Sequence, residues 1–380
     1  MRHVYLDHNS TTPVDPDVVE AMAAFYREKF GNPSSIHWAG RQVKEAVEVA
    51  RSRVAQLVNC DPSEVVFTSG GTEADNMAIK GVAAALRERG NHIITFRTEH
   101  PAVLATCLHL EQLGCEITRL GVDRDGMPDP SELEEAITDR TILVAAMLAN
   151  HETGVLFPVE EIGGIAAKRK IYFHCDGVQG VGKVTVDFRG SSISLLALSG
   201  HKFNAPKGTG ALIVRKGVKL APLVHGGPQE RNRRAGTENV AGIVGLGAAC
   251  QLARERIVHD GRRVAILRER LEAGILAAVP DVRLNGRKDR RLPTTASLSF
   301  HGVEADSLLM NLDLKGIAAS AGSACSSGVL KESPVIAAMG VDPFYARGTI
   351  RFSLGRTTSD ADIDYVLEVV PKIVARLRRD

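Results

Sequence analysis

The chain has 380 residues, of which 44% are hydrophobic and 24% are charged. This composition is typical of a folded globular protein and excludes a chain that is disordered throughout. The 47 basic residues are nearly balanced by 45 acidic ones, which gives a net charge of +2. A protein that binds nucleic acid through its bulk charge is therefore disfavoured.

Export and membrane signals are not evident. The first ten residues, MRHVYLDHNS, lack the apolar core of a signal peptide, and charge-free stretches such as 239–253 are too short to span a bilayer. The six cysteines are scattered and form no CxxC pair, which favours reduced thiols over a disulfide framework. We expect a cytoplasmic protein with no membrane partner.

Helical and strand patterns alternate along the first two thirds of the chain. Helical spacing begins after the capping pair Asp15-Pro16. Strands separated by helices predict an α/β fold with a mainly parallel sheet that is covered on both faces. The expected helices lie at 18–30, 41–58, 74–89, 102–113, 131–136 and 159–168, and the expected strands at 64–69, 92–96, 116–120, 141–148, 171–175, 194–198 and 210–214.

The character of the sequence changes after a long helical region at 242–278. Strand patterns at 295–300, 318–320 and 349–354 and a final helix at 360–377 predict a smaller α+β lobe. We expect a large domain at 15–257 and a small domain made of residues 1–14 and 258–380.

Polar residues follow several strands at the point where each strand ends. The segment Gly70-Gly71-Thr72-Glu73 opens a helix, where converging backbone N–H groups favour a phosphate, although a plain turn capped by Thr72 is the alternative. The loops 98–100 and 150–152 carry His100 and His151, and each loop alone is a weak signal.

A carboxylate and a lysine follow two later strands. Asp176 comes directly after 171–175, where a buried carboxylate needs a partner such as a pyridinium N–H, a helix cap or a salt bridge. Lys202 follows 194–198, and a partly desolvated lysine can form a Schiff base. A phosphate cradle, a carboxylate and a lysine at one sheet edge are the three contacts that pyridoxal phosphate needs.

The segment 177–183, GVQGVGK, nearly matches the Walker A pattern GxxxxGK[ST] of nucleotide-binding proteins. The position of the Mg²⁺-binding hydroxyl is taken by Val184, so we interpret the segment as a false match. A nucleotide hydrolase is kept only as an alternative. A non-enzymatic scaffold is disfavoured because so many polar loops converge on one sheet edge.

The chain resembles pyridoxal-phosphate-dependent cysteine desulfurases of the nitrogen-fixation and iron–sulfur type, which are class V relatives of the aminotransferases. The resemblance runs from residue 5 to residue 358, and it implies the fold-type-I architecture with a seven-stranded sheet in the large domain, and a homodimer. Its motifs are YLDHNSTTPVDP (5–16), FGNPSSIH (30–37), VVFTSGGTEADN (65–76), TEHPAVL (98–104), HCDGVQGVGK (174–183), LSGHKFNAPKGTGAL (198–212), HGGPQERNRRAGTEN (225–239), SAGSACSSG (320–328) and IRFSLGRTT (350–358).

The resemblance also implies site residues. Lys202 would bind the cofactor covalently and then abstract the substrate's α-proton, and His100 would stack over the ring and assist proton transfer. Arg351 would bind the substrate carboxylate. Cofactor contacts would come from Gly71, Thr72, His151, Asp176, Gln179, Ser199 and His201, while Thr237 would reach the phosphate bound by the partner subunit.

Cys325 stands out by its neighbours as well. It lies in AGSACSSG (321–328), where small residues and two glycines give a loop free to move, whereas an inert buried cysteine is more typical of an apolar run. We expect Cys325 to be the nucleophile, on a small-domain loop of about residues 320–334. No metal cofactor is expected, although Cys325 could contact a transferred cluster.

The expected reaction converts L-cysteine to L-alanine, with the sulfur passed to Cys325 as a persulfide and then to an acceptor protein of unknown identity. Iron–sulfur assembly, tRNA thiolation and DNA phosphorothioation all begin in this way, and no direct binding of nucleic acid is expected. A selenocysteine lyase or another class V aminotransferase is the alternative. Two positions depart from the family pattern, because His151 replaces an asparagine and Arg347 replaces a histidine.

Overall fold

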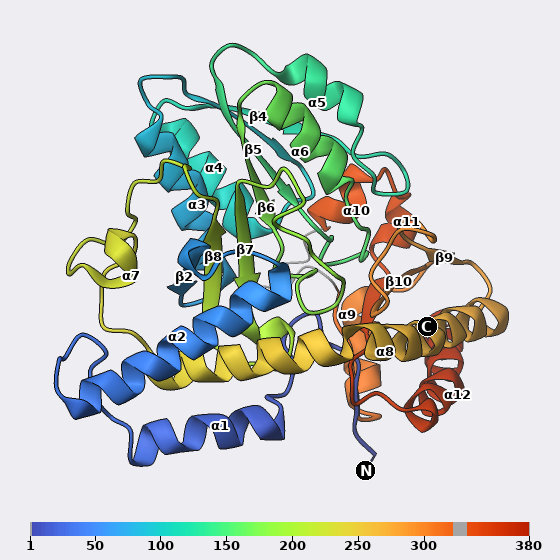
Figure 1. Ribbon diagram of the computed structural model, residues 1–380. Coiled ribbons are helices and arrows are strands. Elements are labelled where there is room, and N and C mark those ends of the chain that lie inside the picture. Colours follow the sequence, from blue (N-terminus) through green and yellow to red (C-terminus); the bar gives the residue numbers. More distant parts are fainter. Residues whose placement is uncertain (1, 322–332, 380) are drawn as a thin grey trace.

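The computed structural model describes residues 2–321 and 333–379, and a seven-stranded sheet forms its centre (Figure 1). The strand order is β2-β8-β7-β6-β5-β3-β4, in which β8 pairs antiparallel with both β2 and β7 and the other pairs are parallel. The expected α/β class with a mainly parallel sheet is therefore confirmed. The strands are β2 (Val65–Thr68), β3 (His92–Phe96), β4 (Glu116–Leu120), β5 (Thr141–Met147), β6 (Tyr172–Asp176), β7 (Leu195–Ser199) and β8 (Gly210–Val214).

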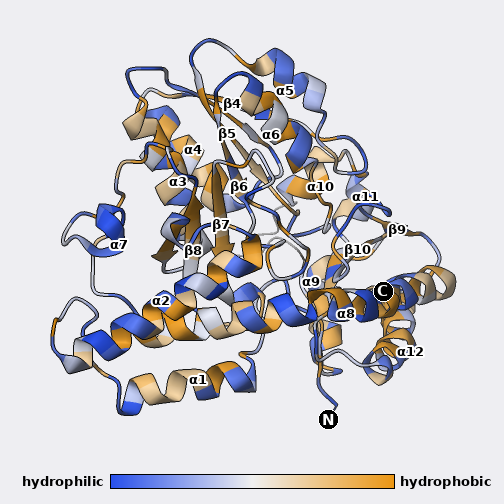
Figure 2. Cartoon of the chain, viewed as in Figure 1, coloured by the Kyte–Doolittle hydropathy of each residue, from blue (hydrophilic) through white to orange (hydrophobic). Residues whose placement is uncertain are grey.

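Helices cover both faces of this sheet because its strands are apolar on both sides. Along β7, Leu195 and Ala197 pack with the helices α3 and α4, whereas Leu196 and Leu198 face the opposite cluster, which includes α2, α6 and α8. Figure 2 shows the result, with orange strands and two-toned helices around them. These helices are α1 (Pro16–Arg27), α2 (Trp38–Val58), α3 (Gly71–Ala85), α4 (Pro101–Gln112), α5 (Pro130–Ala136) and α6 (Val159–Lys168).

A second lobe surrounds a three-stranded antiparallel sheet in the order β12-β10-β9. The helix α8 (Val240–Ala278) connects the two cores, because its first part packs with the large sheet and its last part with the small one. The remaining elements are β1 (Val4–Tyr5), α7 (Gln229–Asn232), β9 (Val282–Leu284), β10 (Thr295–Phe300), α9 (Ala305–Asp313), β11 (Ile317–Ala318), α10 (Pro334–Ala338), α11 (Pro343–Ala346), β12 (Thr349–Ser353) and α12 (Asp360–Leu377).

The N-terminal segment belongs to both lobes. Its strand β1 pairs with β11 in parallel, and Asp7 bridges to Ser353 at the end of β12. Residues 9–15 then cross to the large domain, where Thr12 N–H donates to the carbonyl of His201 at 2.9 Å. Within the described part of the chain, no helix combines the length and the apolar character needed to cross a membrane.

Candidate active site

A cavity of about 230 Å³ lies where the strands β5, β6 and β7 end and the helix α3 begins. Ligands of doubly wound sheets bind at such an edge. Nine predicted site residues line it: Gly71, Thr72, His100, His151, Asp176, Gln179, Ser199, His201 and Lys202. Of the other three, Arg351 contacts the wall, Thr237 is exposed on a loop outside this lining, and Cys325 lies outside the described residues.

The anion cradle is formed by the first turn of α3. Gly70 has a φ of +153° and offers no side chain to cap the helix, so the first backbone N–H groups stay open. A Cβ on Gly71 would lie 2.5 Å from Cγ2 of Val178, so only glycine keeps this approach clear. Ser199 and His201 contribute polar side chains to the same cavity.

Asp176 ends β6 and is buried, with 6% of its surface exposed. Its Oδ1 accepts the N–H of Val178 at 2.9 Å. Burial, together with the nearby Asp75, raises the pKa of Asp176 to about 6. A cationic partner would therefore be strongly favoured beside this carboxyl group.

A buried pair of a histidine and a carboxyl group lies close to Asp176. Nε2 of His174 is 3.0 Å from Oδ1 of Asp75, and neither side chain is exposed beyond 1%. Burial raises the pKa of Asp75 and lowers that of His174. The sequence did not predict this pair. Asp75 lies within α3 and His174 within β6, 99 residues apart, and no local pattern brings them together.

Lys202 occupies a short 3₁₀ turn (Gly200–Lys202) that follows β7. Its Nζ donates to the backbone carbonyls of Asn9 at 2.6 Å and Ser10 at 2.9 Å. Burial, with Arg351 as the next cause, lowers the pKa of Lys202 to about 8. A substantial fraction of this amine is therefore neutral near physiological pH, which a nucleophilic or basic lysine requires.

Two histidines of the cavity lining contact each other. The rings of His100 and His151 meet edge to face, with centroids 5.4 Å apart. His100 caps α4 by accepting the N–H of Ala102 at Nδ1, so the proton of its neutral ring lies on Nε2. Burial lowers the pKa of His151 well below its usual value, and its Nδ1 has no partner among the described residues.

The amide of Gln179 is held from two sides. Its Nε2 donates to the carbonyl of Asn9 at 2.9 Å, and its Oε1 accepts from Nζ of Lys183 at 2.7 Å. Lys183 is the final residue of the segment that nearly matches Walker A. That segment forms turns rather than opening a helix, and its glycines serve close packing, since a Cβ on Gly177 would lie 2.6 Å from Cδ1 of Leu196. The geometry thus argues against the nucleotide-hydrolase alternative.

Arg351 on β12 joins the two lobes. It is 3% exposed, and its Nη2 donates to Oδ1 of Asp7 and Oγ of Ser10, both at 2.8 Å. Its Nη1 donates to the carbonyl of His151 at 2.9 Å. Nε finds no partner in the described chain, so at least one donor is left to bind a further group.

The five described cysteines are poor nucleophiles. Cys60, Cys107, Cys175 and Cys250 are buried, and Cys115 is partly buried. Burial raises the pKa of each thiol, to about 12 for Cys60 and Cys107. A thiol with a raised pKa is rarely ionised and reacts slowly.

Sequence reasoning missed the N-terminal residues that complete the site. Asp7, Asn9 and Ser10 contact Arg351, Gln179 and Lys202, but they follow a strand of only two residues, Val4–Tyr5, which gives no pattern in the sequence. The run DHNST was visible as a motif. Nothing local indicated that its backbone carbonyls would face a lysine more than 190 residues away.

The comparisons with known proteins agree with this geometry. The family model described as Aminotransferase class-V matches residues 4–366. The cysteine desulfurase IscS of Methanosarcina thermophila is 52% identical over 375 residues, covering 99% of this chain and 93% of that protein. A cysteine desulfurase of Nostoc sp. is 50% identical over 378 residues, covering 100% of this chain and 94% of that protein.

Solved structures point the same way. One described as a NifS-like protein has a TM-score of 0.94 and 37% identity, covering 99% of this chain and 100% of that one. Another, SspA in complex with cysteine, has a TM-score of 0.83 and 35% identity, covering 93% of this chain and 99% of that one. The chain therefore belongs to the cysteine desulfurase family of the class V aminotransferases, as its motifs indicated.

Proposed function

We propose that this protein is a pyridoxal-phosphate-dependent cysteine desulfurase, which converts L-cysteine to L-alanine and passes the sulfur to an enzyme thiol. One observation carries the proposal. The amine of Lys202, with its lowered pKa, shares a cavity with the carboxyl group of Asp176 and the open N-terminus of α3. The family relationship supports the same reaction.

The residues of the cavity fit pyridoxal phosphate. Glycines at 70 and 71 leave room for a phosphate at a helix N-terminus, and the buried carboxyl group of Asp176 calls for a cationic partner. The orphaned Nδ1 of His151 is a further polar atom in need of a partner. When bound, the cofactor supplies an electron sink that stabilises negative charge at the substrate's α-carbon.

The side chains of the site would transfer the protons and bind the substrate carboxylate. Lys202, neutral in part near physiological pH, would take the α-proton at Nζ and return it. His100 lines the cavity, and with Nδ1 held by Ala102 its Nε2 would donate or accept a proton there. Arg351 would hold the substrate carboxylate with the donor that is still free.

Cys325 is proposed as the thiol that receives the sulfur. The residues on either side of the undescribed segment 322–332 support this role. Ser320 pairs through its backbone with Arg351 at 2.7 and 3.2 Å, and Oγ of Ser333 donates to Oε2 of Glu152 at 2.6 Å. Arg351 in turn donates to the carbonyl of His151, a residue of the cavity lining, so the chain leaves the described part of the small lobe beside the site.

The decisive test is persulfide trapping on the purified holoenzyme after cysteine is added. The wild-type protein should yield alanine and a persulfide on Cys325, detected by mass spectrometry. Cys325→Ser should bind the cofactor normally but form no persulfide, and Lys202→Ala should lose the visible absorbance of the bound cofactor. Formation of a keto acid in place of alanine, or sulfide release by Cys325→Ser at the wild-type rate, would refute the proposal.

We further propose a cytoplasmic homodimer that delivers sulfur to an acceptor protein. The exposed loop at 225–239 supports the dimer, because Thr237 lies there and outside the lining of its own cavity. Sedimentation of the holoenzyme tests the dimer, and incubation of the loaded enzyme with candidate acceptor proteins tests the transfer.

A further inference from the structure

Lys183 is a lysine at the active site that the proposed mechanism does not use. Its Nζ donates to Oε1 of Gln179 at 2.7 Å and to Oδ1 of Asn9 at 2.9 Å. Both partners are neutral amides. The side chain is half-buried, and no ion pair to Lys183 exists within the described residues.

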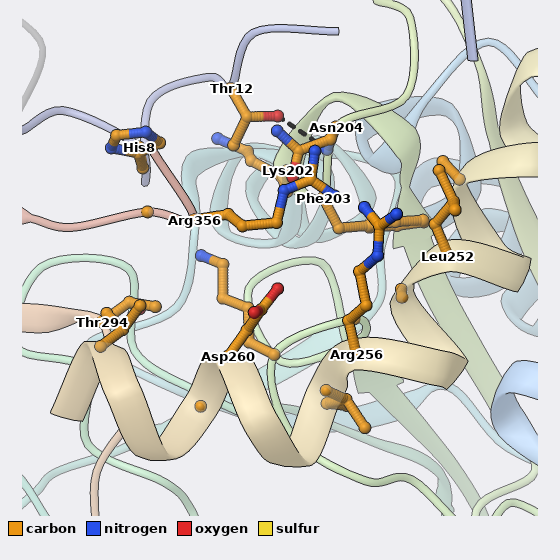
Figure 3. A pocket seen from close by; sticks show the side chains of 18 of the residues that line it. His8, Thr12, Lys202, Phe203, Asn204, Leu252, Arg256, Asp260, Thr294 and Arg356 are labelled. Carbon is orange, nitrogen blue, oxygen red and sulfur yellow. Dashed lines mark hydrogen bonds between the residues drawn. The ribbon is translucent and has the colours of Figure 1, made fainter. Parts of the chain in front are cut away.

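The charged groups around Lys183 are mostly positive. Lys202 and Arg351 act on it from the active-site side, while His8 and His201, which also feel the charge of Lys183, each have a pKa lowered to about 4 and are neutral. Lys183 also lines a second cavity, of about 90 Å³, that Lys202 lines as well. Figure 3 shows the other charged side chains at that cavity, Arg356, and Arg256 and Asp260 on α8; the carboxyl group of Asp15 also lines it. Burial and the neighbouring cations lower the pKa of Lys183 well below its usual value.

The amine of Lys183 determines how two amides point. A lysine amine donates its protons here, so the oxygen of each amide must face it. The Nε2 of Gln179 is then turned to the carbonyl of Asn9, and Nδ2 of Asn9 is turned to Oγ1 of Thr295 at 2.9 Å and to the carbonyl of His151 at 3.2 Å. The same carbonyl of Asn9 accepts from Lys202.

We propose that Lys183 is a positioning residue of the active site, which fixes the amide of Gln179 in the wall of the cofactor cavity and, through the Asn9 side chain, holds the residue whose backbone carbonyl accepts from Lys202. The inference rests on the proposed function and deepens it. Lys183 touches neither of the predicted reacting groups, so it acts through Gln179 and Asn9. Without the amine of Lys183, the side-chain amides of Gln179 and Asn9 could each rotate by 180°, which would exchange the positions of their oxygen and nitrogen atoms.

The test is the pH titration of the visible absorbance of the bound cofactor, measured on the holoenzyme without substrate. Lys183→Met removes the donor and the charge at nearly constant volume. We expect the midpoint to rise by about half a pH unit or more, because the oriented N–H of Gln179 donates to the same Asn9 carbonyl as Lys202 and so opposes protonation at the Lys202 nitrogen. Lys183→Arg, which keeps charge and donors, should restore the wild-type midpoint.

Two controls separate positioning from other effects. Lys168→Met removes a similar charge from the exposed end of α6 and should leave the midpoint unchanged. In a Gln179→Leu background, Lys183→Met should shift the midpoint by less than half as much as it does in the wild type. Should Lys183→Met fail to fold by circular dichroism, Lys183→Gln takes its place with the same expected shift.

The outcomes are distinguishable. A midpoint in Lys183→Met equal to that in Lys168→Met would overturn the inference, and so would an undiminished shift in the Gln179→Leu background. Wild-type protein that acquires no visible absorbance with pyridoxal phosphate would instead refute the proposed function itself.

Discussion

The most direct physical consequence of the site concerns the amine of Lys202. Its ordinary pKa of 10.5 is lowered to about 8, first by burial and then by the charge of Arg351. At pH 7.5 about a quarter of the amine is therefore neutral, against about one part in a thousand for an exposed lysine. At this pH the neutral, nucleophilic form of Lys202 is therefore roughly 200 times more abundant than that of an exposed lysine.

This prediction can be measured on protein from which the cofactor has been removed. Lysines are labelled with a trace of acetic anhydride across a pH series, and peptide mass spectrometry gives the fraction that has reacted at each residue. The reactivity of Lys202 should titrate with a midpoint near 8, with the exposed Lys168 as the internal reference. Arg351→Gln should raise that midpoint, because it removes a nearby positive charge. A midpoint for Lys202 above about 9.5 would refute the reasoning.

The same shift has a consequence for stability. The unfolded chain binds this proton up to a pH near 10.5, whereas the folded protein releases it near 8. The unfolded state therefore binds more protons between these values, and the free energy of unfolding should rise with pH across this window. Below about pH 8 the folded protein carries the full cost of protonating Lys202 in its buried site.

Three further predictions concern individual residues. Glu230→Ala leaves Arg51 buried without its bidentate partner and should destabilise the protein by about 3–5 kcal/mol in urea unfolding, whereas Glu368→Ala, at an exposed ion pair, should leave the stability almost unchanged; equal losses would contradict the prediction. His151→Asn should keep the wild-type pH profile of activity near neutral pH, because burial holds the pKa of the imidazole well below its usual value of 6.5, and a profile that changes near neutrality would contradict this. Gly71→Ala should weaken cofactor binding by about tenfold or more in an absorbance titration, because its methyl group would meet a valine side chain at 2.5 Å, and unchanged affinity would argue against the cradle.

Much of the fold could be read from hydrophobic patterns. The strands β3, β5 and β7 and the long helix α8 were predicted to within about three residues, because strands buried on both faces form continuous apolar runs and a long helix repeats its apolar positions many times. Short elements such as α7, α10 and α11 escaped prediction. They are four or five residues long, and their positions depend on packing rather than on local pattern.

Local pattern likewise indicated Asp176 and Lys202, since each directly follows an apolar strand and parallel strands end at one edge of a sheet. It did not indicate their partners. Asn9 and Ser10 reach Lys202 across more than 190 residues of chain, and Lys183 was set aside as part of a false nucleotide motif. Which residues carry polar chemistry is encoded in short stretches of chain. Which of these polar residues become desolvated, and so acquire shifted pKa values, depends on segments that meet only when the two lobes pack together.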